Sequence, residues 1–256
     1  MNAQTNQNIH GKFDITVVTV VRNGERVISE CIESVLSQGI DRLEYIIVDG
    51  ASTDNTLEII RGFGDAVTQC ISEPDTGLYD AMNKGLRHAR GYYVHFLNSD
   101  DRYSSEDTLK RVMPLLDSQS VCHGQMYYVN SSGDRKLLGE PFSRKRELKA
   151  SRMPQPAMIV PRFMYEKVGE FDTNYRIAAD YDMVLRLTEH YPAHFVPVPI
   201  TVMHTGGISF QRPDLAFGES LKVARKHGRS WIGSLTDFAL KHFKWILYRL
   251  LNQTRQ

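Results

Sequence analysis

The sequence predicts an α/β fold with a mostly parallel central sheet flanked by helices. In the first half of the chain, short β-branched apolar runs alternate with segments whose apolar residues recur at helical intervals. This alternation favours right-handed strand–helix–strand units, which join parallel strands of one sheet. A composition of 41% hydrophobic and 24% charged residues is typical of a globular chain and excludes disordered and fibrous classes.

The first apolar run, residues 15–21, is β-branched and almost wholly apolar, as in a strand buried on both faces. Apolar side chains then recur at helical spacing from Val27 to Leu36, and Gly39 ends that helix. Further along, the same patterns predict strands at 43–48, 67–71 and 92–97, and helices at 56–61 and 79–90.

The second half is less regular. Ser104 and Asp107 resemble a capping box for a helix that reaches Leu116, and the basic stretch 144–152 is expected to be a mobile loop. Strands are predicted at 121–129 and 195–203, and helices at 181–190 and 214–227.

The C-terminal tail predicts one amphipathic helix. Between residues 232 and 250 the apolar side chains share a helical face, and Lys241, Lys244 and Arg249 lie off that face. Two interpretations stay open: a helix on an anionic membrane surface, or a helix packed against the domain or a partner subunit.

Composition also limits the partners and the compartment. A protein that binds nucleic acid needs many contacts with phosphates, and a formal net charge of +1 argues against such a partner. The three cysteines are far apart and form no CxxC pair, which predicts reduced thiols and no zinc site. With a polar N-terminus and no apolar run of about 18 residues, the protein is expected to be cytoplasmic.

Polar clusters follow the predicted strands, where an open parallel sheet binds its ligands. The first cluster ends the strand at 15–21, and the second follows the strand at 43–48. Asp49 is suited to accept hydrogen bonds from a ribose or a base, whereas Asp54 is better suited to cap the next helix. The candidate donor-binding residues of these two clusters are Thr19, Val20, Arg22, Asn23, Asp49 and Ser52.

The third cluster, residues 72–85, places Asp75 and Asp80 where an entering nucleotide can meet them. Lys84 either offsets phosphate charge or lies on a solvated helix face.

The fourth cluster is Asn98, Ser99, Asp100 and Asp101. Adjacent carboxylates repel each other unless a cation or a donor compensates, so a Mg²⁺ or Mn²⁺ diphosphate site is predicted. A helix-capping turn is the alternative, and it suits Asp101 better than Asp100.

Two later features complete the candidate site. Asp180 and Asp182 begin a predicted helix, where one carboxylate can face a cavity while the other caps the helix or meets solvent. His204 ends a predicted strand and precedes a glycine pair at 206–207, so it is either a ligand or a structural histidine.

With these motifs in this order, residues 15–209 resemble family-2 glycosyltransferases of the GT-A fold, which has a Rossmann-like sheet. The resemblance implies that Asp49 contacts the nucleoside and that Asp180 is the catalytic base. Residues 98–101 fall on the family's Asp-x-Asp metal motif, and His204 on a position that assists the metal or the diphosphate. Residues 73–85 are similar to a bacterial subgroup that builds cell-surface polysaccharides such as colanic acid.

The chain departs from the family pattern at two positions. Asn98 replaces the first aspartate of the metal motif, which leaves Asp100 as its metal ligand, and Ala179 stands where many members have glutamate.

The resemblance implies inverting, metal-dependent transfer of a sugar from a UDP- or GDP-linked donor to a glycan. If the C-terminal tail binds the inner face of the membrane, a lipid-linked acceptor would suit this location. The expected divisions are a polar tail at 1–12, a GT-A domain at 13–212 and a helical extension at 213–256; the domain has a nucleotide-binding half (13–101) and an acceptor half (102–212). The alternatives are a nucleotidyltransferase that releases pyrophosphate and an inactive nucleotide-sugar-binding subunit of an assembly complex.

Overall fold

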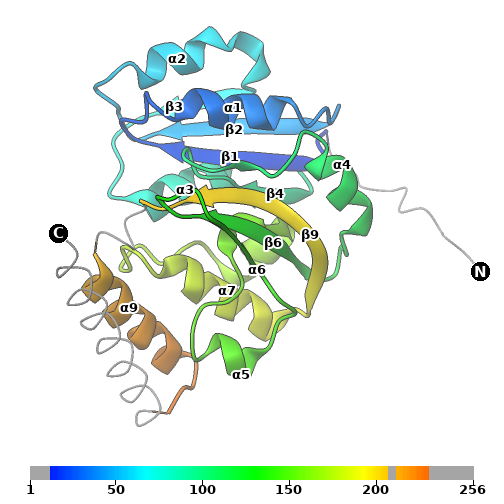
Figure 1. Cartoon of the computed structure of the whole chain (residues 1–256), viewed down its shortest axis with the longest axis vertical. Coiled ribbons are helices and arrows are strands. Elements are labelled where there is room, and N and C mark those ends of the chain that lie inside the picture. Colours follow the sequence, from blue (N-terminus) through cyan, green and yellow to red (C-terminus); the bar gives the residue numbers. More distant parts are fainter. Residues whose placement is uncertain (1–11, 207–211, 231–256) are drawn as a thin grey trace, which may run out of the picture.

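A computed structural model describes residues 12–206 and 212–230. They form a nine-stranded sheet in the order β3-β2-β1-β4-β8-β6-β9-β5, with β7 paired to β6 (Figure 1). The predicted parallel arrangement is confirmed for β3-β2-β1-β4. Its elements are β1 (Ile15–Val21), α1 (Ile28–Leu36), β2 (Leu43–Asp49), α2 (Thr56–Gly62), β3 (Gln69–Ser72), α3 (Leu78–His88) and β4 (Tyr93–Phe96), with a 3₁₀ turn at Gly64–Ala66.

Beyond β4 the sheet becomes mixed. Strands β4 and β8, β8 and β6, β6 and β7, and β5 and β9 pair antiparallel, whereas β6 and β9 are parallel. Residue patterns did not predict β5, β7, β8 or α6. The added elements of this half are β5 (Arg102–Tyr103), β6 (Val121–Val129), β7 (Arg135–Leu138), a 3₁₀ turn at Gln155–Ala157, β8 (Met158–Pro161), α6 (Arg162–Val168), α7 (Ala179–His190) and β9 (Ala193–His204).

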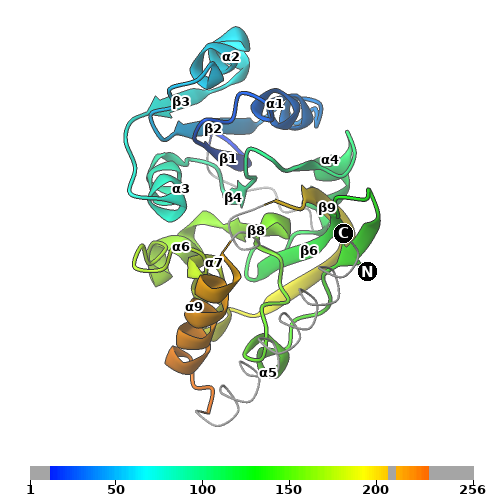
Figure 2. The ribbon, with the colours of Figure 1, turned by 60° about the vertical axis from the view of Figure 1, so that its left-hand side comes forward.

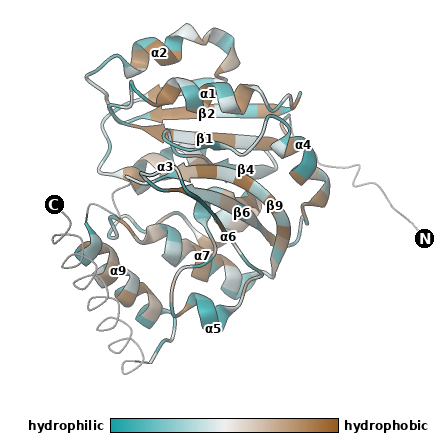
Figure 3. Cartoon of the chain, in the orientation of Figure 1, coloured by the Kyte–Doolittle hydropathy of each residue, from teal (hydrophilic) through white to brown (hydrophobic). Residues whose placement is uncertain are grey.

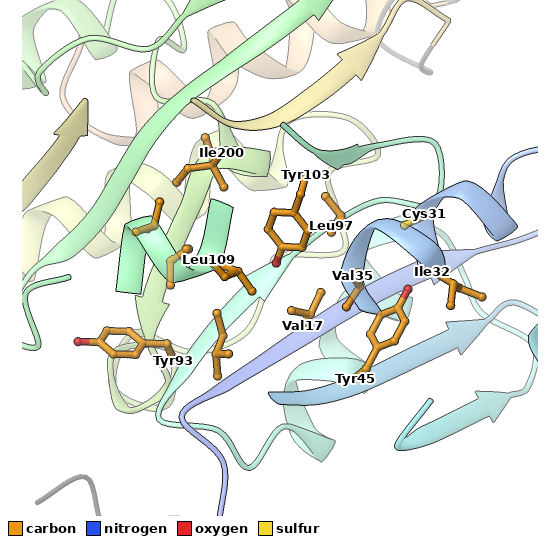
Figure 4. Packing of buried hydrophobic residues seen from close by; sticks show 14 of the residues in the cluster. Val17, Cys31, Ile32, Val35, Tyr45, Tyr93, Leu97, Tyr103, Leu109 and Ile200 are labelled. Carbon is orange, nitrogen blue, oxygen red and sulfur yellow. The ribbon is translucent and has the colours of Figure 1, made fainter. Parts of the chain in front are cut away.

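Two apolar cores lie on the two faces of the sheet. Successive side chains of a strand point to opposite faces, so Val17 joins the core beneath α1 while Val18 joins the core beneath α3. Figure 2 shows α1 and α3 on opposite sides of β1 and β2. In the first core, Val17, Tyr45 and Val35 lie close together (Figure 4). This two-sided burial explains why β1 is apolar along almost its whole length.

The predicted capping box is absent from the described residues around α4 (Thr108–Val112), which continues as a 3₁₀ turn at Met113–Leu115. The helix begins after Asp107, which makes no side-chain capping bond. Instead the Thr108 hydroxyl accepts the backbone N–H of Ser105 at 3.0 Å, and Ser104 donates to the Pro199 carbonyl at 2.5 Å. The serine at the predicted cap position therefore tethers this segment to β9.

The basic stretch 144–152 is not simply a mobile loop, because it contains the short helix α5 (Arg144–Glu147). Figure 3 shows α5 as a hydrophilic element on the surface. Its Glu147 is nevertheless buried, and the guanidinium groups of Arg146 and Arg152 both pair with Glu140. These contacts give the stretch a defined course along the protein.

The helix predicted at 214–227 is α9 (Pro213–Lys226), which lies beside α7 (Figures 1 and 2). Asp182 of α7 neither caps its helix nor meets solvent: it is buried and pairs with Lys226 at 2.9 Å and His227 at 3.0 Å. The predicted tail helix at 232–250 lies outside the described residues. Within the described ranges, no helix is both long and apolar enough to cross a membrane.

Candidate active site

A cleft of about 1030 Å³ opens beyond the carboxyl ends of β1 and β4. Residues from α3, the β6–β7 hairpin, the end of β9 and the start of α7 form its walls. The predicted site residues that line it are Val20, Arg22, Asp75, Asn98, Ser99, Asp100, Asp180 and His204. The predicted site residues outside its lining are Thr19, Asn23, Asp49, Ser52, Asp80 and Lys84.

The loops that follow β1 and β2 are tied to each other. The N–H of Asn23 donates to the Ser52 hydroxyl at 2.7 Å, and the Asn23 side-chain oxygen accepts the N–H of Thr53 at 2.9 Å. Asn23 and Ala51 both have positive φ angles, 52° and 55°, which non-glycine residues rarely adopt. Asn23 and Ser52 therefore shape the loops beside the cleft rather than line it.

Asp49 is fully buried at the end of β2. Its carboxylate accepts the N–H of Ser52 at 3.1 Å, the Ser72 hydroxyl at 2.7 Å and, in a short contact, the Ser52 hydroxyl. These donors occupy the lone pairs that a ribose would need. The structure gives Asp49 a loop-holding role, and its contact with a nucleoside stays a prediction.

Asp75 reaches the cleft across the backbone of Gly50. A Cβ at position 50 would collide with the Asp75 carboxylate and approach Cδ of Arg22 to 3.3 Å. Glycine at position 50 leaves room for the Asp75 carboxylate in its observed place, with Arg22 nearby. Together they place a carboxylate and a guanidinium at this end of the cleft.

The contacts of Lys84 correspond neither to a cation that offsets phosphate charge nor to a side chain on a solvated helix face. Its ammonium donates to the Pro74 carbonyl at 2.6 Å and pairs with Glu73 at 2.9 Å, so it braces the loop before α3. Asp80 accepts the N–H of Thr76 at 3.0 Å, a bond that lowers the pKa of this carboxyl. Thr19 is buried against Tyr45, whose hydroxyl lies 3.1 Å from it. All three residues support the site from outside its lining.

The cluster after β4 places both of its aspartates at the cleft. Asp100 is exposed at the cleft, whereas Asp101 is 2% exposed and also lines it, so Asp101 does not cap a helix. The Asn98 amide donates to Oδ2 of Asp101 at 3.2 Å, but Oδ1 of Asp101 and Oδ1 of Asn98 are buried without a partner. Burial, reinforced by the Asp100 charge, raises the pKa of Asp101 well above its ordinary value.

Two orphaned oxygen acceptors beside an exposed carboxylate fit a hard cation, which prefers oxygen ligands. His204 lines the same cleft from the end of β9. Among the residues with described positions, however, no three His, Cys, Asp or Glu side chains converge closely enough to hold an ion by themselves. The arrangement suits an ion that takes its remaining ligands from a bound diphosphate or water.

Asp180 lies at the start of α7 and faces the cleft. Burial raises the pKa of its carboxyl, although the N–H of Tyr181 at 2.7 Å and the Tyr79 hydroxyl at 3.1 Å oppose that rise. A raised pKa makes the ionised carboxylate a stronger proton acceptor. The geometry therefore suits Asp180 to the role of a general base.

Some cleft residues were missed from the sequence. Tyr79 lies in a quoted cluster, but no local pattern links it to Asp180, 101 positions away. Lys136 of β7 brings positive charge to the cleft from a strand whose local sequence carries no motif, whereas Arg152 belongs to the basic stretch 144–152 that the sequence had shown. Much of the remaining lining is apolar: Leu78, Met82, Met126, Leu137, Leu138, Met153 and Met203.

Solved structures share this fold. S. aureus TarS (residues 1–349) in complex with UDP-GlcNAc aligns with a TM-score of 0.71 and 19% identity, over 91% of this chain and 73% of that chain. A longer TarS chain is covered to 44%. Mannosyltransferase PcManGT from Pyrobaculum calidifontis, in complex with GDP-Man and Mn²⁺, aligns with a TM-score of 0.64 and 20% identity, over 89% and 68%. These similarities confirm the predicted GT-A fold.

Curated relatives are glycosyltransferases by name. An uncharacterized glycosyltransferase of Mycobacterium tuberculosis (strain H37Rv) is 29% identical over 231 residues, 84% of each chain. The PGL/p-HBAD biosynthesis glycosyltransferase of Mycobacterium bovis (strain BCG) is 30% identical over 180 residues, 68% of each chain. The sequence model of glycosyl transferase family 2 matches residues 16–170, which confirms the predicted enzyme class and opposes the nucleotidyltransferase alternative. The chain therefore belongs to glycosyl transferase family 2.

Proposed function

We propose that this protein is an inverting, metal-dependent glycosyltransferase of bacterial cell-surface polysaccharide synthesis. It moves a sugar from a nucleoside diphosphate donor to an acceptor hydroxyl. The observation that carries the proposal is a single cleft lined by the base candidate Asp180 and by the carboxylates of Asp100 and Asp101. The UDP-GlcNAc bound to TarS and the GDP-Man bound to PcManGT support a donor of this class.

The donor binds with its nucleoside at the carboxyl ends of β1 and β2. Val20, Arg22 and Asp75 line this part of the cleft, and Asp75 accepts hydrogen bonds from the nucleoside. Asn98 and Ser99 hold the diphosphate side, and Lys136 and Arg152 offset its negative charge across the cleft.

Asp100 and Asp101 hold a Mn²⁺ or Mg²⁺ ion, with His204 beside the diphosphate. When bound, the ion neutralises charge on the departing nucleoside diphosphate. The unpartnered Oδ1 atoms of Asp101 and Asn98 support this role, as does the Mn²⁺ in the PcManGT complex.

Asp180 removes the proton of the acceptor hydroxyl. The acceptor oxygen forms a bond to the anomeric carbon while the bond from that carbon to the diphosphate oxygen breaks, so the configuration inverts. General-base assistance of this kind contributes about 10²- to 10⁴-fold to a rate. The Tyr79 hydroxyl, 3.1 Å from Oδ1 of Asp180, donates to the carboxylate and helps to hold it in place.

The acceptor is a glycan, and a lipid-linked glycan fits the apolar part of the cleft. Met126, Leu137, Met153 and Met203 line that part, and methionine side chains adapt to acyl chains of varied shape. A lipid-linked acceptor would place the enzyme at the inner face of the cell membrane, with the C-terminal tail as its contact.

Two measurements test the proposal. The first is calorimetric titration with UDP and GDP, each with and without Mn²⁺, and the second is an assay for release of the nucleotide from UDP-sugars and GDP-mannose. We expect micromolar binding of one nucleotide that requires the metal, and slow release of that nucleotide from its sugar. Binding without release would favour the inactive binding subunit. If neither nucleotide binds, nor dTDP in a repeat, the proposed donor class is wrong.

A further inference from the structure

Glu219 of α9 binds the chain that leads into α7. Its carboxylate is 6% exposed. It accepts the backbone N–H of Arg176 at 3.0 Å, of Ile177 at 2.8 Å and of Ala178 at 3.1 Å. Three consecutive peptide N–H groups are thus satisfied by one side chain that lies more than 40 positions further along the chain.

Those three N–H groups lie just before Ala179, the first helical residue of α7. Ala178, at the N-cap position, makes no side-chain capping bond, and its N–H is the one of the three that belongs to the helix end, where N–H groups lack partners within the helix. Glu219 therefore binds the N–H of the N-cap residue and holds the segment that enters α7, and its negative charge near this end interacts favourably with the helix dipole.

The same peptide segment holds the base. The carbonyl oxygen of Ile177 accepts the Tyr79 hydroxyl at 2.6 Å, and that hydroxyl lies 3.1 Å from Oδ1 of Asp180. The N–H of Ile177 is bound by Glu219 and its C=O by Tyr79. Movement of this segment would shift Asp180, which is only three residues further along.

A second set of contacts fixes α9 against α7. The buried Asp182 pairs with Lys226 at 2.9 Å and with His227 at 3.0 Å, about two helical turns beyond Glu219. Arg229 also donates to the Leu148 carbonyl at 2.7 Å. The helix α9, which carries Glu219, is therefore held against α7 by contacts that do not involve Glu219.

We propose that Glu219 is a positioning residue for Asp180, so that α9 forms part of the catalytic apparatus although it lies beyond the residues that match the family. The inference rests on the proposed function of Asp180 as the base. Glu219 holds the segment 176–178, and that segment sets where the Asp180 carboxylate meets the acceptor.

Glu219 also acts on Asp180 by its charge. Burial is the main cause of the raised pKa of Asp180, and the negative charge of Glu219 adds to it, whereas the Tyr79 hydrogen bond opposes it. Lys136 and Arg152 line the same cleft and carry the opposite charge. Removing the Glu219 charge should therefore move the acidic limb of the pH–rate profile to lower pH.

The experiment compares full-length wild type with Glu219→Gln, Glu219→Ala and Asp180→Asn. The control is Glu189→Gln, an exposed carboxylate on α7 that does not contact segment 176–178. Turnover is nucleotide release from UDP-glucose, UDP-galactose, UDP-GlcNAc and GDP-mannose with Mn²⁺. Hydrogen–deuterium exchange of a peptide spanning residues 175–182 reports on the segment itself.

We expect Glu219→Ala to lower kcat about 10- to 100-fold, the cost of displacing a reacting group, with KM for the donor little changed. The amides of 176–178 should exchange faster. Glu219→Gln keeps the shape and one acceptor, so it should recover part of kcat and show the shift of the acidic limb. The control variant should match wild type in kcat, in the pH–rate profile and in the exchange of the 176–178 amides.

The outcomes separate the two claims. If Asp180→Asn is inactive while Glu219→Ala keeps kcat and the pH profile, the positioning role is wrong even when the variant melts at a lower temperature. If Asp180→Asn keeps full turnover, the proposed base is wrong whatever Glu219 does. If wild type releases no nucleotide from any of the four donors, the proposed function fails, and unchanged exchange at 176–178 would then overturn the contact role of Glu219 as well.

Discussion

The hydroxyl of Tyr79 lies 3.1 Å from Oδ1 of Asp180 and 2.6 Å from the carbonyl oxygen of Ile177. A hydroxyl has one proton to donate and two lone pairs that accept. The hydroxyl proton can be donated to either acceptor, and when it is donated to Asp180 it stabilises the carboxylate relative to the carboxylic acid. The relationship ties α3, which carries Tyr79, to the base on α7.

Replacing Tyr79 by phenylalanine should lower kcat about 10-fold and leave nucleotide affinity unchanged. Losing a donor to a buried group costs roughly 1–3 kcal/mol, and about 1.4 kcal/mol corresponds to tenfold in rate. The Tyr79 hydrogen bond lowers the pKa of Asp180, so its loss should move the acidic limb of the pH–rate profile to higher pH. A profile that does not move, or moves to lower pH, contradicts this role.

Asp180→Asn should abolish turnover while the nucleotide still binds with near-normal affinity. The asparagine has a similar shape but cannot take a proton, so only a role in the transition state is lost. Calorimetry with the nucleotide and a release assay check the two parts separately. Equal loss of binding and turnover would contradict the assignment of the base.

Asp100→Ala should weaken nucleotide binding in the presence of Mn²⁺ but not in its absence. Without the exposed Asp100 carboxylate, Asp101 is the one remaining carboxylate proposed to hold the ion, so the metal should strengthen nucleotide binding less. Calorimetric titrations with and without Mn²⁺ measure the difference, with the surface variant Asp65→Ala as the matched control. Undiminished metal dependence would refute Asp100 as a ligand.

Relative to wild type, Glu147→Gln should be more favourable for the stability of the protein at pH 8 than at pH 5. Burial raises the pKa of Glu147 to about 7 from its ordinary value of 4.5, although the N–H groups of Arg152 and Met153 oppose the rise. Because the folded-state pKa is raised, its stabilising contribution is complete below about pH 4.5 and is lost as pH rises through 7. The neutral glutamine avoids a cost on the order of 3 kcal/mol.

Melting temperatures of both proteins across pH 5 to 8 test this. The gap between Glu147→Gln and wild type should widen in favour of the variant as pH rises. Glu189→Gln, which alters an exposed carboxylate, should show no such trend. A gap that is constant with pH would mean that Glu147 is ionised at no cost.

Asp182→Asn should lower the free energy of unfolding at pH 7 by roughly 3 kcal/mol, the low end for breaking a buried ion pair, because Lys226 is partly exposed. Burial alone would raise the pKa of Asp182, but hydrogen bonds from His227 and Lys226 hold it well below its ordinary value of 3.8. A lowered folded-state pKa gives stability that is present above 3.8 and lost as pH falls below it.

Urea unfolding at pH 7 provides the measurement for Asp182→Asn. As the control, substitution of the exposed Glu58 of α2 by glutamine should change the free energy by no more than about 0.5 kcal/mol. A loss for Asp182→Asn as small as that of the control would show that α9 is not anchored by this carboxylate.

Local patterns were sufficient for the parallel half of the sheet. The alternation of apolar runs predicted β1 at its observed bounds and β2 to within one residue, because strand and helix periodicities differ clearly when both faces of a strand are buried. They were insufficient for β5, which has two residues, and for β7 and β8, which have four each. Two residues are too few to reveal a period, and β7 is largely exposed and lacks an apolar run. β8 is as long as β3 and β4, but it lies outside the regular alternation of strands and helices that revealed those two.

The sequence by itself determined which residue types end each strand, and the sheet then brings those ends to one cleft. Arg22, Asp75 and Asp100 could be selected in this way because parallel strands bind their ligands at that edge, whereas Asp180, at the start of a helix, was selected through the family resemblance.

Only the tertiary structure decided what those residues touch. In the folded chain Asp101 rather than Asp100 is buried, and serine hydroxyls donate hydrogen bonds to Asp49. Glu219 contacts the segment that leads into α7. A residue's burial and hydrogen-bond partners come from segments distant in sequence, and no local period encodes them.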